Sequence, residues 1–236
     1  MFDRFKRRSY ELEYIDTGNY TAAEYEDCIG ELQLVNRWMG DAHTLKNTLF
    51  KEVAGEQLRE FSILDVGAGS GELLRLTVTW ARKTDRSVRA VGLELNERSA
   101  ASILEESHNF PEISSVRGDA LALPFADADF DYVMCSLFTH HFAEEQVVQI
   151  LREMNRVARR RIVVIDLHRH PMAYLLYTTL GKLVLKNRLL RHDGALSILR
   201  SFKAEELLAL AQRAGLRDVG VSRHFPYRLA LNAQTT

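Results

Sequence analysis

Residues 63–74 read Ile63-Leu64-Asp65-Val66-Gly67-Ala68-Gly69-Ser70-Gly71-Glu72-Leu73-Leu74. A short apolar run ends in a glycine-rich turn, and an amphipathic pattern follows, which predicts a strand, a tight loop and a helix. Glycine has no Cβ atom, so such a turn can adopt unusual backbone angles and let a ligand lie against the main chain. The first amide groups of the next helix point into the same space. The stretch therefore predicts a ligand-binding loop at the end of a strand.

The loop has the pattern G-x-G-x-G, and the residue that follows it bears on the ligand. A dinucleotide fingerprint would have Gly or Ala at position 72, where this chain has Glu72. A carboxylate in the first helical turn repels a pyrophosphate, so the pattern favours a ligand that has none. The alternative is a glycine-rich turn that binds nothing.

Composition limits the class of protein. The chain has 236 residues, a net charge of −1 and 46 % hydrophobic residues, which suits one domain with a sizeable core and gives no global field for nucleic acid. Its two cysteines are too few for a disulfide framework and do not have the spacing of metal ligands. The basic N-terminus is not followed by an apolar signal core, and residues 171–181 are too short an apolar run to span a membrane. We expect a cytoplasmic protein without stable membrane insertion.

Strand and helix patterns alternate after residue 60. We expect strands at about 62–66, 88–94, 113–117, 130–135 and 161–166, helices at about 71–83, 96–107, 144–158 and 204–214, a helical insertion near 171–200 whose first helix reaches about 190, and a final hairpin from 218–223 and 227–232. This order predicts an α/β fold with a Rossmann-like, mostly parallel seven-stranded sheet, helices on both faces and an antiparallel C-terminal edge hairpin.

Residues 1–60 are expected to form a helical N-terminal extension to the domain of residues 61–236. Thr21-Ala22-Ala23-Glu24 is a capping box, and a second helix is expected from about Asp41 to Val53. Apolar residues recur behind the box at Ile29, Leu32, Leu34, Val35 and Trp38. Tyr20, Tyr25 and Trp38 either pack against the core or belong to a cover over a ligand cleft.

Acidic residues follow two further strands. In open α/β sheets, ligands bind at the carboxyl ends of the strands. Glu94 after the second strand can accept hydrogen bonds from both hydroxyls of a ribose, and its alternative is a helix-start residue that favours the dipole. Asp119 after the third strand can accept from an adenine amino group, and its alternative is a turn or N-cap residue.

Three stretches in this order resemble the class I S-adenosylmethionine-dependent methyltransferases: residues 63–71, Val-Gly-Leu-Glu-Leu at 91–95, and Gly-Asp-Ala-Leu-Ala-Leu-Pro-Phe-Ala-Asp-Ala-Asp-Phe-Asp-Tyr-Val at 118–133. Residues 123–131 are most similar to the small-molecule branch that includes ubiquinone and menaquinone methyltransferases. The resemblance covers residues 60–165. It implies S-adenosylmethionine as cofactor and S-adenosylhomocysteine as product.

The resemblance also implies a role for individual positions. Asp65 and the backbone at Gly67, Ala68 and Gly69 would hold the methionine end of the cofactor. Glu94 would hold the ribose, Leu95 would pack on the adenine, Asp119 and Ala120 would read the adenine edge, and the main chain near Ser136 would lie by the sulfonium. Residues 1–60 and 167–202 match no shared family pattern, and substrate choice usually resides in such segments.

Two adjacent histidines, His140 and His141, follow the fourth strand. A phenol has a pKa of about 10, so methylation of its oxygen gains from a base that works near pH 7, and histidine suits that task. Either histidine is a candidate general base; the alternative is that one caps the next helix or bonds the backbone. Relatives in the quinone branch also tend to carry histidine here, so the pair does not establish O-methylation.

Other polar clusters are candidates for binding the acceptor. His168, His170 and Tyr174 are expected to bond a polar group of the substrate or the loop backbone. The segment Asp166-Leu167-His168-Arg169-His170 and the later Arg191-His192-Asp193 offer metal-ligand types, but no His pair is spaced to share one helix face. We therefore predict no required metal.

Two segments allow more than one interpretation. The apolar run from Tyr174 to Leu185, followed by Lys186, Arg188 and Arg191, is a lid over an apolar pocket, a helix on a membrane surface, or a core helix with a cationic end. The basic run Arg152, Arg156, Arg159, Arg160 and Arg161 is either an RNA-binding face or, as the helix-then-strand context favours, a solvated surface.

The sequence thus predicts a methyltransferase that acts on a small, largely apolar acceptor, phenolic or polyketide-like, with O-methylation favoured. One alternative is C-methylation of a quinone-like ring. Others are an RNA or protein methyltransferase and a non-catalytic module that only binds the cofactor. We expect a small-molecule acceptor, no nucleic acid partner and at most peripheral membrane contact.

Overall fold

The computed structural model of the protein describes residues 2–18, 20, 21, 24, 27, 28, 31 and 40–235. Its centre is a seven-stranded sheet with the order β3-β2-β1-β4-β5-β7-β6. The strands are β1 (Glu60–Val66), β2 (Ser87–Glu94), β3 (Ile113–Arg117), β4 (Phe130–Ser136), β5 (Ala158–Leu167), β6 (Arg217–His224) and β7 (Arg228–Gln234). The strand β7 runs antiparallel to its two neighbours, β5 and β6, and the other described strand pairs are parallel. The fold class predicted from the sequence is confirmed.

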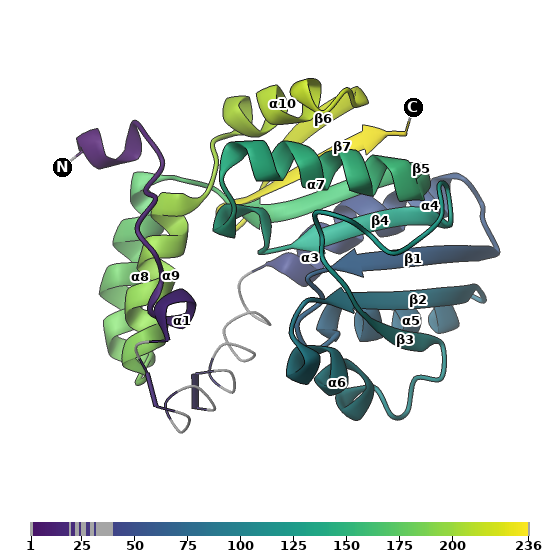
Figure 1. Ribbon diagram of the computed structural model, residues 1–236, viewed down its shortest axis with the longest axis horizontal. Helices are drawn as coiled ribbons and strands as arrows, with labels where there is room; N and C mark the ends of the chain where they lie inside the picture. Colours follow the sequence, from purple (N-terminus) through teal and green to yellow (C-terminus); the bar gives the residue numbers. More distant parts are fainter. Residues whose placement is uncertain are drawn as a thin grey trace.

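Helices cover both faces of the sheet, as the alternating pattern requires (Figure 1). The helices α7 (Glu144–Val157) and α10 (Ala204–Arg213) pack on one face around Phe130, Leu151 and Leu207. The helices α5 (Glu72–Lys83) and α6 (Glu97–Glu106) pack on the other face around Ile63, Leu74 and Ile103. Because β1 and β4 are covered by both layers, nearly all their residues are buried and most of them are apolar.

The segment from residue 41 to residue 55 belongs to the core. It comprises α3 (Asp41–Leu45), the π-helical turn η2 (Lys46–Phe50) and α4 (Lys51–Gly55). Leu45, Leu49 and Val53 are fully buried in the layer that contains α5, and Phe50 stacks on Trp80 with ring centroids 4.3 Å apart. This part of the predicted extension therefore packs against the sheet.

The start of the chain runs along a separate pair of helices. Its short elements η1 (Phe2–Phe5) and α1 (Tyr14–Thr17) lie beside α8 (Pro171–Val184) and α9 (Arg188–Arg200), which stand beyond the carboxyl ends of the strands (Figure 1). The predicted capping box is present, since the Thr21 and Glu24 side chains bond each other's backbone amides. Tyr20 packs against the cluster of Leu185 and Leu189. The other predicted apolar positions of this segment, Tyr25, Ile29, Leu32, Leu34, Val35 and Trp38, lie outside the described residues.

The helical insertion contains two helices with a break at residues 185–187. The expected helical region from Pro171 to about Leu190, within an insertion near 171–200, is divided into α8, which ends at Val184, and α9, which continues to Arg200. The reason is local: Asn187 accepts a hydrogen bond from the Leu189 amide and so caps a new helix.

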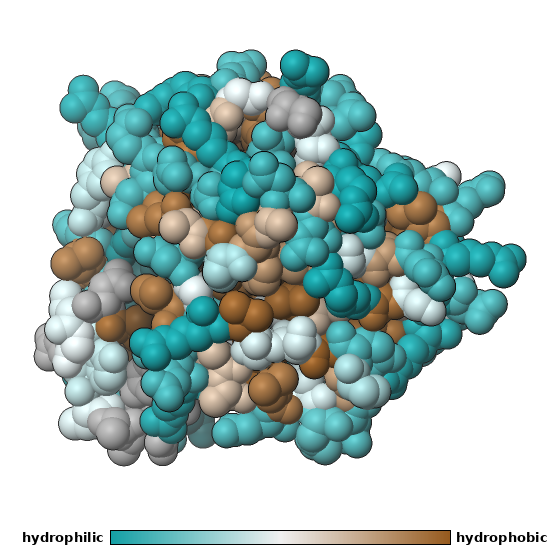
Figure 2. Space-filling view, turned by 45° about the vertical axis from the view of Figure 1, so that its right-hand side comes forward, coloured by the Kyte–Doolittle hydropathy of each residue, from teal (hydrophilic) through white to brown (hydrophobic). Residues whose placement is uncertain are grey.

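The surface is mainly hydrophilic. Apolar residues gather in a band across the middle of the visible face, with hydrophilic residues around it (Figure 2). Within the described ranges, no helix combines the length and the apolar character that a membrane crossing requires.

Candidate active site

The glycine loop joins β1 to α5 at the centre of the sheet, where the strand order reverses. Gly67 has a φ of 74° and donates its amide to the Leu93 carbonyl at 2.9 Å. A Cβ atom at this position would collide with the ring of Phe138, which follows β4. Gly67 is therefore required both by its backbone angle and by the aromatic ring above it.

Two buried polar atoms beside this loop have no hydrogen-bond partner among the described residues. They are Oδ1 of Asp65, at the end of β1, and Oγ of Ser136, at the end of the adjacent β4. Burial and the nearby Glu94 carboxylate raise the pKa of Asp65 to about 8. Leaving a buried carboxyl oxygen unsatisfied costs about 1–3 kcal/mol. Such a group is suited to receive a cationic or hydrogen-bond-donating ligand.

Glu94 faces the glycine loop from the end of β2. Its Oε1 accepts the amide of Gly69 at 2.6 Å, and burial raises its pKa. The helix-start role falls to Asn96, whose side chain accepts from the amides of Arg98 and Ser99. The dipole alternative for Glu94 is thereby removed. Leu95 beside it leaves 65 % of its surface exposed, which is a large apolar area for an isolated side chain.

Asp119 and Ala120 follow β3. Asp119 is exposed and its Oδ1 accepts the Leu121 amide at 2.9 Å, which is the turn geometry of its alternative interpretation. Ala120 is buried beneath it. The adenine role of this pair stays a prediction.

His140 is held by a buried carboxylate. Its Nδ1 lies 2.7 Å from Oδ1 of Asp166, and only 3 % of His140 is exposed. Asp166 also accepts hydrogen bonds from the Thr139 hydroxyl and from the amides of His140 and Leu167. The histidine contact and these donors outweigh the effect of burial and lower the pKa of Asp166 to about 2. Because this carboxylate can only accept, the proton of neutral His140 resides on Nδ1 and Nε2 carries the free lone pair.

His141 lies next to His140 and is more accessible. The two ring centroids are 4.2 Å apart, and a third of the His141 side chain is exposed. Its Nδ1 is 3.9 Å from Oε2 of Glu13, a buried residue from the N-terminal segment. Glu13, His140 and His141 each offer a ligand atom within 4.8 Å of the others. Yet Glu13 accepts a hydrogen bond from Ser197 at 2.8 Å and forms an ion pair with Arg200 at 3.8 Å. Because side chains of the protein already bind this carboxylate, we retain the prediction of no required metal.

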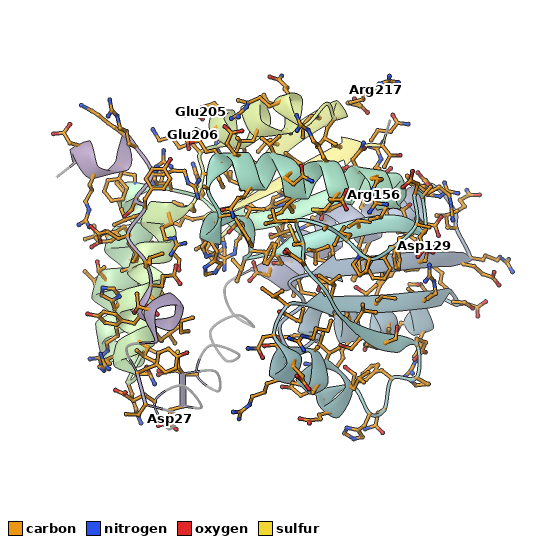
Figure 3. All side chains as sticks on the ribbon, in the orientation of Figure 1. Asp27, Asp129, Arg156, Glu205, Glu206 and Arg217 are labelled. Carbon is orange, nitrogen blue, oxygen red and sulfur yellow. The ribbon has the colours of Figure 1, made fainter. Side chains whose placement is uncertain are left out.

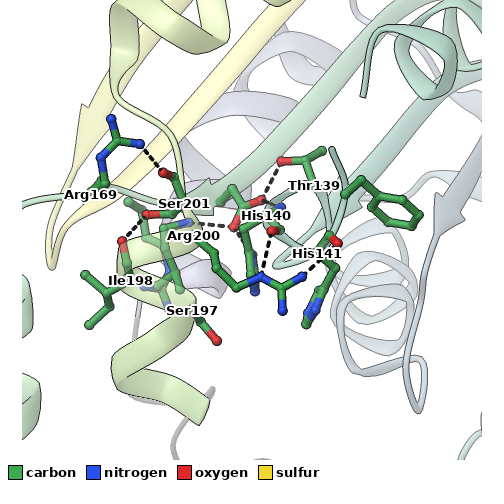
Figure 4. A network of polar contacts seen from close by, with 12 residues as sticks. Thr139, His140, His141, Arg169, Ser197, Ile198, Arg200 and Ser201 are labelled. Carbon is green, nitrogen blue, oxygen red and sulfur yellow. Dashed lines mark hydrogen bonds and ion pairs between the residues drawn. The ribbon is translucent and has the colours of Figure 1, made fainter. Parts of the chain in front are cut away.

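Two guanidinium groups fix the backbone of the histidine loop, and Figure 4 shows the one that belongs to Arg200. Arg200 of α9 donates to the carbonyls of His140 and His141. Arg8 of the N-terminal segment donates to the carbonyls of His140, Phe142 and Arg200 and lies 3.7 Å over the ring of Phe202. Sequence reasoning missed Arg8, Glu13 and Arg200, because each is far along the chain from the histidines.

His168 and His170 lie in a different place from the histidine pair. They line a pocket of about 910 Å³ beyond the end of β5, whose described lining contains neither His140 nor His141. His170 caps α8 through the Met172 amide, and burial lowers the pKa of His168 to about 4. The Tyr174 hydroxyl accepts from Arg4 at 3.1 Å. The substrate role of these three residues stays a prediction.

The other predicted clusters have structural partners. Asp193 accepts the amides of Tyr14 and Ile15 and so caps α1, while His192 stacks on Tyr14. Arg156, far from α8 in Figure 3, bonds Glu153 and Asp127. The remaining arginines of the basic run likewise contact acceptors of the chain: Arg152 the Arg213 carbonyl, Arg159 Asp131, Arg160 Glu56, and Arg161 Glu52. These contacts favour a structural surface over an RNA-binding face.

Comparison with known proteins agrees with this geometry. Residues 63–161 match the family model described as a methyltransferase domain. A 2-phytyl-1,4-naphtoquinone methyltransferase of Thermosynechococcus vestitus is 34 % identical over 110 residues, which cover 46 % of each chain. A demethylmenaquinone methyltransferase of Staphylococcus carnosus is 28 % identical over 170 residues, 67 % of this chain and 68 % of that one. The chain thus spans about half the length of the first of these relatives.

A solved structure shares the fold over the full chain. The magnesium protoporphyrin IX methyltransferase of Synechocystis, solved with bound S-adenosylhomocysteine, superposes with a TM-score of 0.58 at 16 % identity and covers 100 % of this chain and 94 % of that one. Residues 63–161 thus match a methyltransferase domain, and the loop and the sheet order give the chain a Rossmann-like methyltransferase fold. Its curated relatives above act on naphthoquinone and menaquinone precursors, as their names state.

Proposed function

We propose that this protein transfers the methyl group of S-adenosylmethionine to a small, largely apolar acceptor. The observation that carries the cofactor half of this proposal is Asp65, a buried carboxyl group with an unpartnered oxygen at the glycine loop. The α-ammonium of S-adenosylmethionine would supply the donor and the positive charge that this oxygen lacks. Glu94 would exchange its bond to Gly69 for the ribose hydroxyls, and the exposed face of Leu95 would be covered by the adenine.

The acceptor half rests on the pair His140 and Asp166. Methyl transfer is an in-line displacement in which a new bond to carbon forms as the sulfur–carbon bond breaks, and the protein supplies alignment and a competent nucleophile. For a hydroxyl acceptor, the proton would pass from the acceptor oxygen to Nε2 of His140. Asp166 would hold the ring in the required tautomer and stabilise the imidazolium that results, as a carboxylate does in other His–Asp pairs.

O-methylation of a phenol-like or polyketide-like hydroxyl is the reaction favoured by this base. A second candidate is C-methylation of a quinone-like ring, because the curated relatives named above are methyltransferases of quinones. A carbon nucleophile flanked by hydroxyl groups would need the same deprotonation, so His140 serves either reaction.

The test uses methyl-labelled S-adenosylmethionine, the purified protein and an extract of source cells. We expect label in the organic phase, and mass spectrometry with chemical dealkylation would then tell an O-methyl from a C-methyl product. Label in the acid-precipitated pellet would instead indicate a macromolecular acceptor and overturn the small-molecule proposal. Transfer in neither fraction would favour a module that binds the cofactor without turnover.

The base assignment has its own experiment. His140→Gln should lower kcat about 10²–10⁴-fold, because the acceptor proton loses its receiver, while S-adenosylmethionine affinity stays within about twofold. Wild-type kcat and an unchanged pH profile in both His140→Gln and His141→Gln would exclude both histidines.

A further inference from the structure

One side of α8 presents an apolar surface that no described residue covers. Met172, Leu175, Leu176, Leu180 and Val184 are between 40 % and 71 % exposed. Residues three or four apart share a helix face, so these five side chains form one stripe along the helix, which we call the α8 stripe. The adjoining side of the helix packs on α9, where the Tyr177 hydroxyl donates to the Leu190 carbonyl and its ring fills the space above Gly194. The α8 stripe is therefore not the side through which α8 packs on α9.

Cationic side chains lie at both ends of the α8 stripe. At its start, Arg4 bonds the Tyr174 hydroxyl and stacks over that ring at 4.6 Å, which fixes η1 against the first turns of α8. Exposed Lys6 and Arg7 follow Arg4 in the chain. At its far end, Lys186 is exposed two residues after Val184. An apolar helix face bordered by cations is the arrangement of a helix that lies in a membrane interface.

The pocket of about 910 Å³ opens beside the same surface. Leu176 belongs both to the α8 stripe and to the pocket lining, and Phe225 at the pocket is 84 % exposed. Lys203 and Arg223 bring two cations to the lining against the single carboxylate of Glu205, and Lys6 of the lining forms an ion pair with Asp3 at 2.6 Å. Its two other arginines, Arg169 and Arg228, are buried in ion pairs with Glu206 and Asp41. The pocket thus adds an excess of positive charge next to the apolar stripe.

We propose that the α8 stripe and the adjoining basic pocket dock this protein on the surface of an anionic lipid bilayer. The charge of this surface decides the occupant: the chain as a whole has a net charge of −1, yet cations dominate here, and each cation near an anionic bilayer strengthens binding about fivefold. The stripe would lie at the boundary of head groups and acyl chains, and the pocket cations would meet lipid phosphates. A second copy of the chain would bring the same cations against one another. The inference goes beyond the methyl-transfer proposal and does not depend on its acceptor.

The experiment is co-sedimentation of the full chain with vesicles of phosphatidylglycerol and phosphatidylcholine, compared with vesicles of phosphatidylcholine alone. We expect the protein to pellet with the anionic vesicles and to partition at least tenfold more weakly onto the neutral ones. Leu180→Glu and Val184→Glu should each reduce partition about tenfold or more, because each replaces a buried apolar contact by a charge. Arg223→Gln should reduce it about fivefold at low salt, and Lys6→Gln should reduce it less, because Asp3 pairs with Lys6.

Matched controls separate this surface from general stickiness. Leu104→Glu changes a 50 % exposed leucine of α6, and Arg217→Gln changes an arginine at the other end of β6 from Arg223, far from Glu205 in Figure 3; both should bind vesicles as the wild type does. Circular dichroism of every variant checks the fold. Absence of the wild type from anionic pellets would overturn the proposal. So would equal loss in the control variants, or a stable dimer in solution that dissociates only in Leu180→Glu and Val184→Glu and does not bind vesicles.

Discussion

Asp65 and Asp166 end two strands of the same sheet and differ in almost everything except burial. Each is at most 2 % exposed. The pKa of Asp65 is raised to about 8 by burial and by Glu94, whereas His140 and the surrounding donors hold the pKa of Asp166 at about 2. Asp166 accepts hydrogen bonds from side-chain and backbone donors of its own chain, whereas Oδ1 of Asp65 has no hydrogen-bond partner among the described residues. The difference suits the two proposed roles: the proposed base already has its carboxylate partner in the free protein, whereas Asp65 would gain a partner only when the cofactor binds.

The largest expected effect comes from removing the charge of Asp166. Asp166→Asn should lower kcat about 10²–10⁴-fold, because the amide no longer fixes the His140 tautomer or stabilises its imidazolium. Affinity for S-adenosylmethionine, measured by calorimetry, should change less than about twofold. A proportional loss of affinity would show that Asp166 acts by maintaining the whole site and not by orienting the base.

The second effect concerns Asp65, where removing the charge should weaken cofactor binding but stabilise the free protein. Asp65→Asn should weaken S-adenosylmethionine binding about 100-fold, since a buried charge-assisted bond is lost. It should also raise the free energy of unfolding of the free protein by up to about 5 kcal/mol at pH 8, because Asp65 ionises about four pH units lower in the unfolded chain than in the folded protein. Asp129→Asn, at a partly exposed surface pair with Arg89, is the control and should change neither quantity appreciably.

The pH dependence of stability sharpens the same contrast. The folded pKa of Asp166 lies below its unfolded value, so its contribution is present above about pH 4 and is lost as the pH falls towards 2. The folded pKa of Asp65 lies above its unfolded value, so its penalty grows as the pH rises from about 4 to 8. Chemical unfolding from pH 2 to pH 9 measures the free energy of unfolding. Its decrease below pH 4 should be smaller in Asp166→Asn, and its decrease between pH 4 and 8 should be smaller in Asp65→Asn. Identical profiles for the wild type and both variants would contradict the assignment.

The smallest effects concern the neighbours of each carboxylate. Glu94→Gln should lower the pKa of Asp65 by removing a like charge and weaken cofactor binding about tenfold by losing a ribose contact. Its measurement is calorimetry across the pH range, where the midpoint of the affinity change should move downward. A midpoint that stays in place would show that burial alone sets the Asp65 pKa.

His141→Gln should lower kcat less than about tenfold. The reason is that His141 is a third exposed and its Nδ1 lies 3.9 Å from Glu13, whereas Nδ1 of His140 lies 2.7 Å from the buried Asp166. A loss as large as that of His140→Gln would transfer the base assignment to His141.

The sequence predicted the sheet well because its signals are local. The glycine loop, the apolar runs of β1 to β5 and the capping residues act within a few positions, and the observed strand bounds differ from the predicted ones by three residues or fewer. The helix α9 was underestimated because it buries Asp193, Ser197 and Arg200 together with leucines, so its sequence has no clear apolar face.

The acceptor side was only partly predictable for a related reason. His140 and His141 were evident as a pair, but their partners Glu13, Arg8 and Arg200 come from segments that only tertiary packing brings together. Likewise, the sequence placed His168 and His170 on the correct sheet edge but could not show that they line a separate pocket.

The most direct test of the account is the number of protons released when S-adenosylmethionine binds at pH 7. Calorimetry in two buffers of different ionisation enthalpy gives this number. The pKa of Asp65 is about 8 in the free protein, and its carboxylate would pair with the cofactor ammonium. Binding should therefore release about 0.9 of a proton from Asp65 in the wild type, and Asp65→Asn should release no proton from position 65. Equal release by the two proteins, with equal affinity, would contradict the claim that Asp65 is the carboxylate kept for the cofactor.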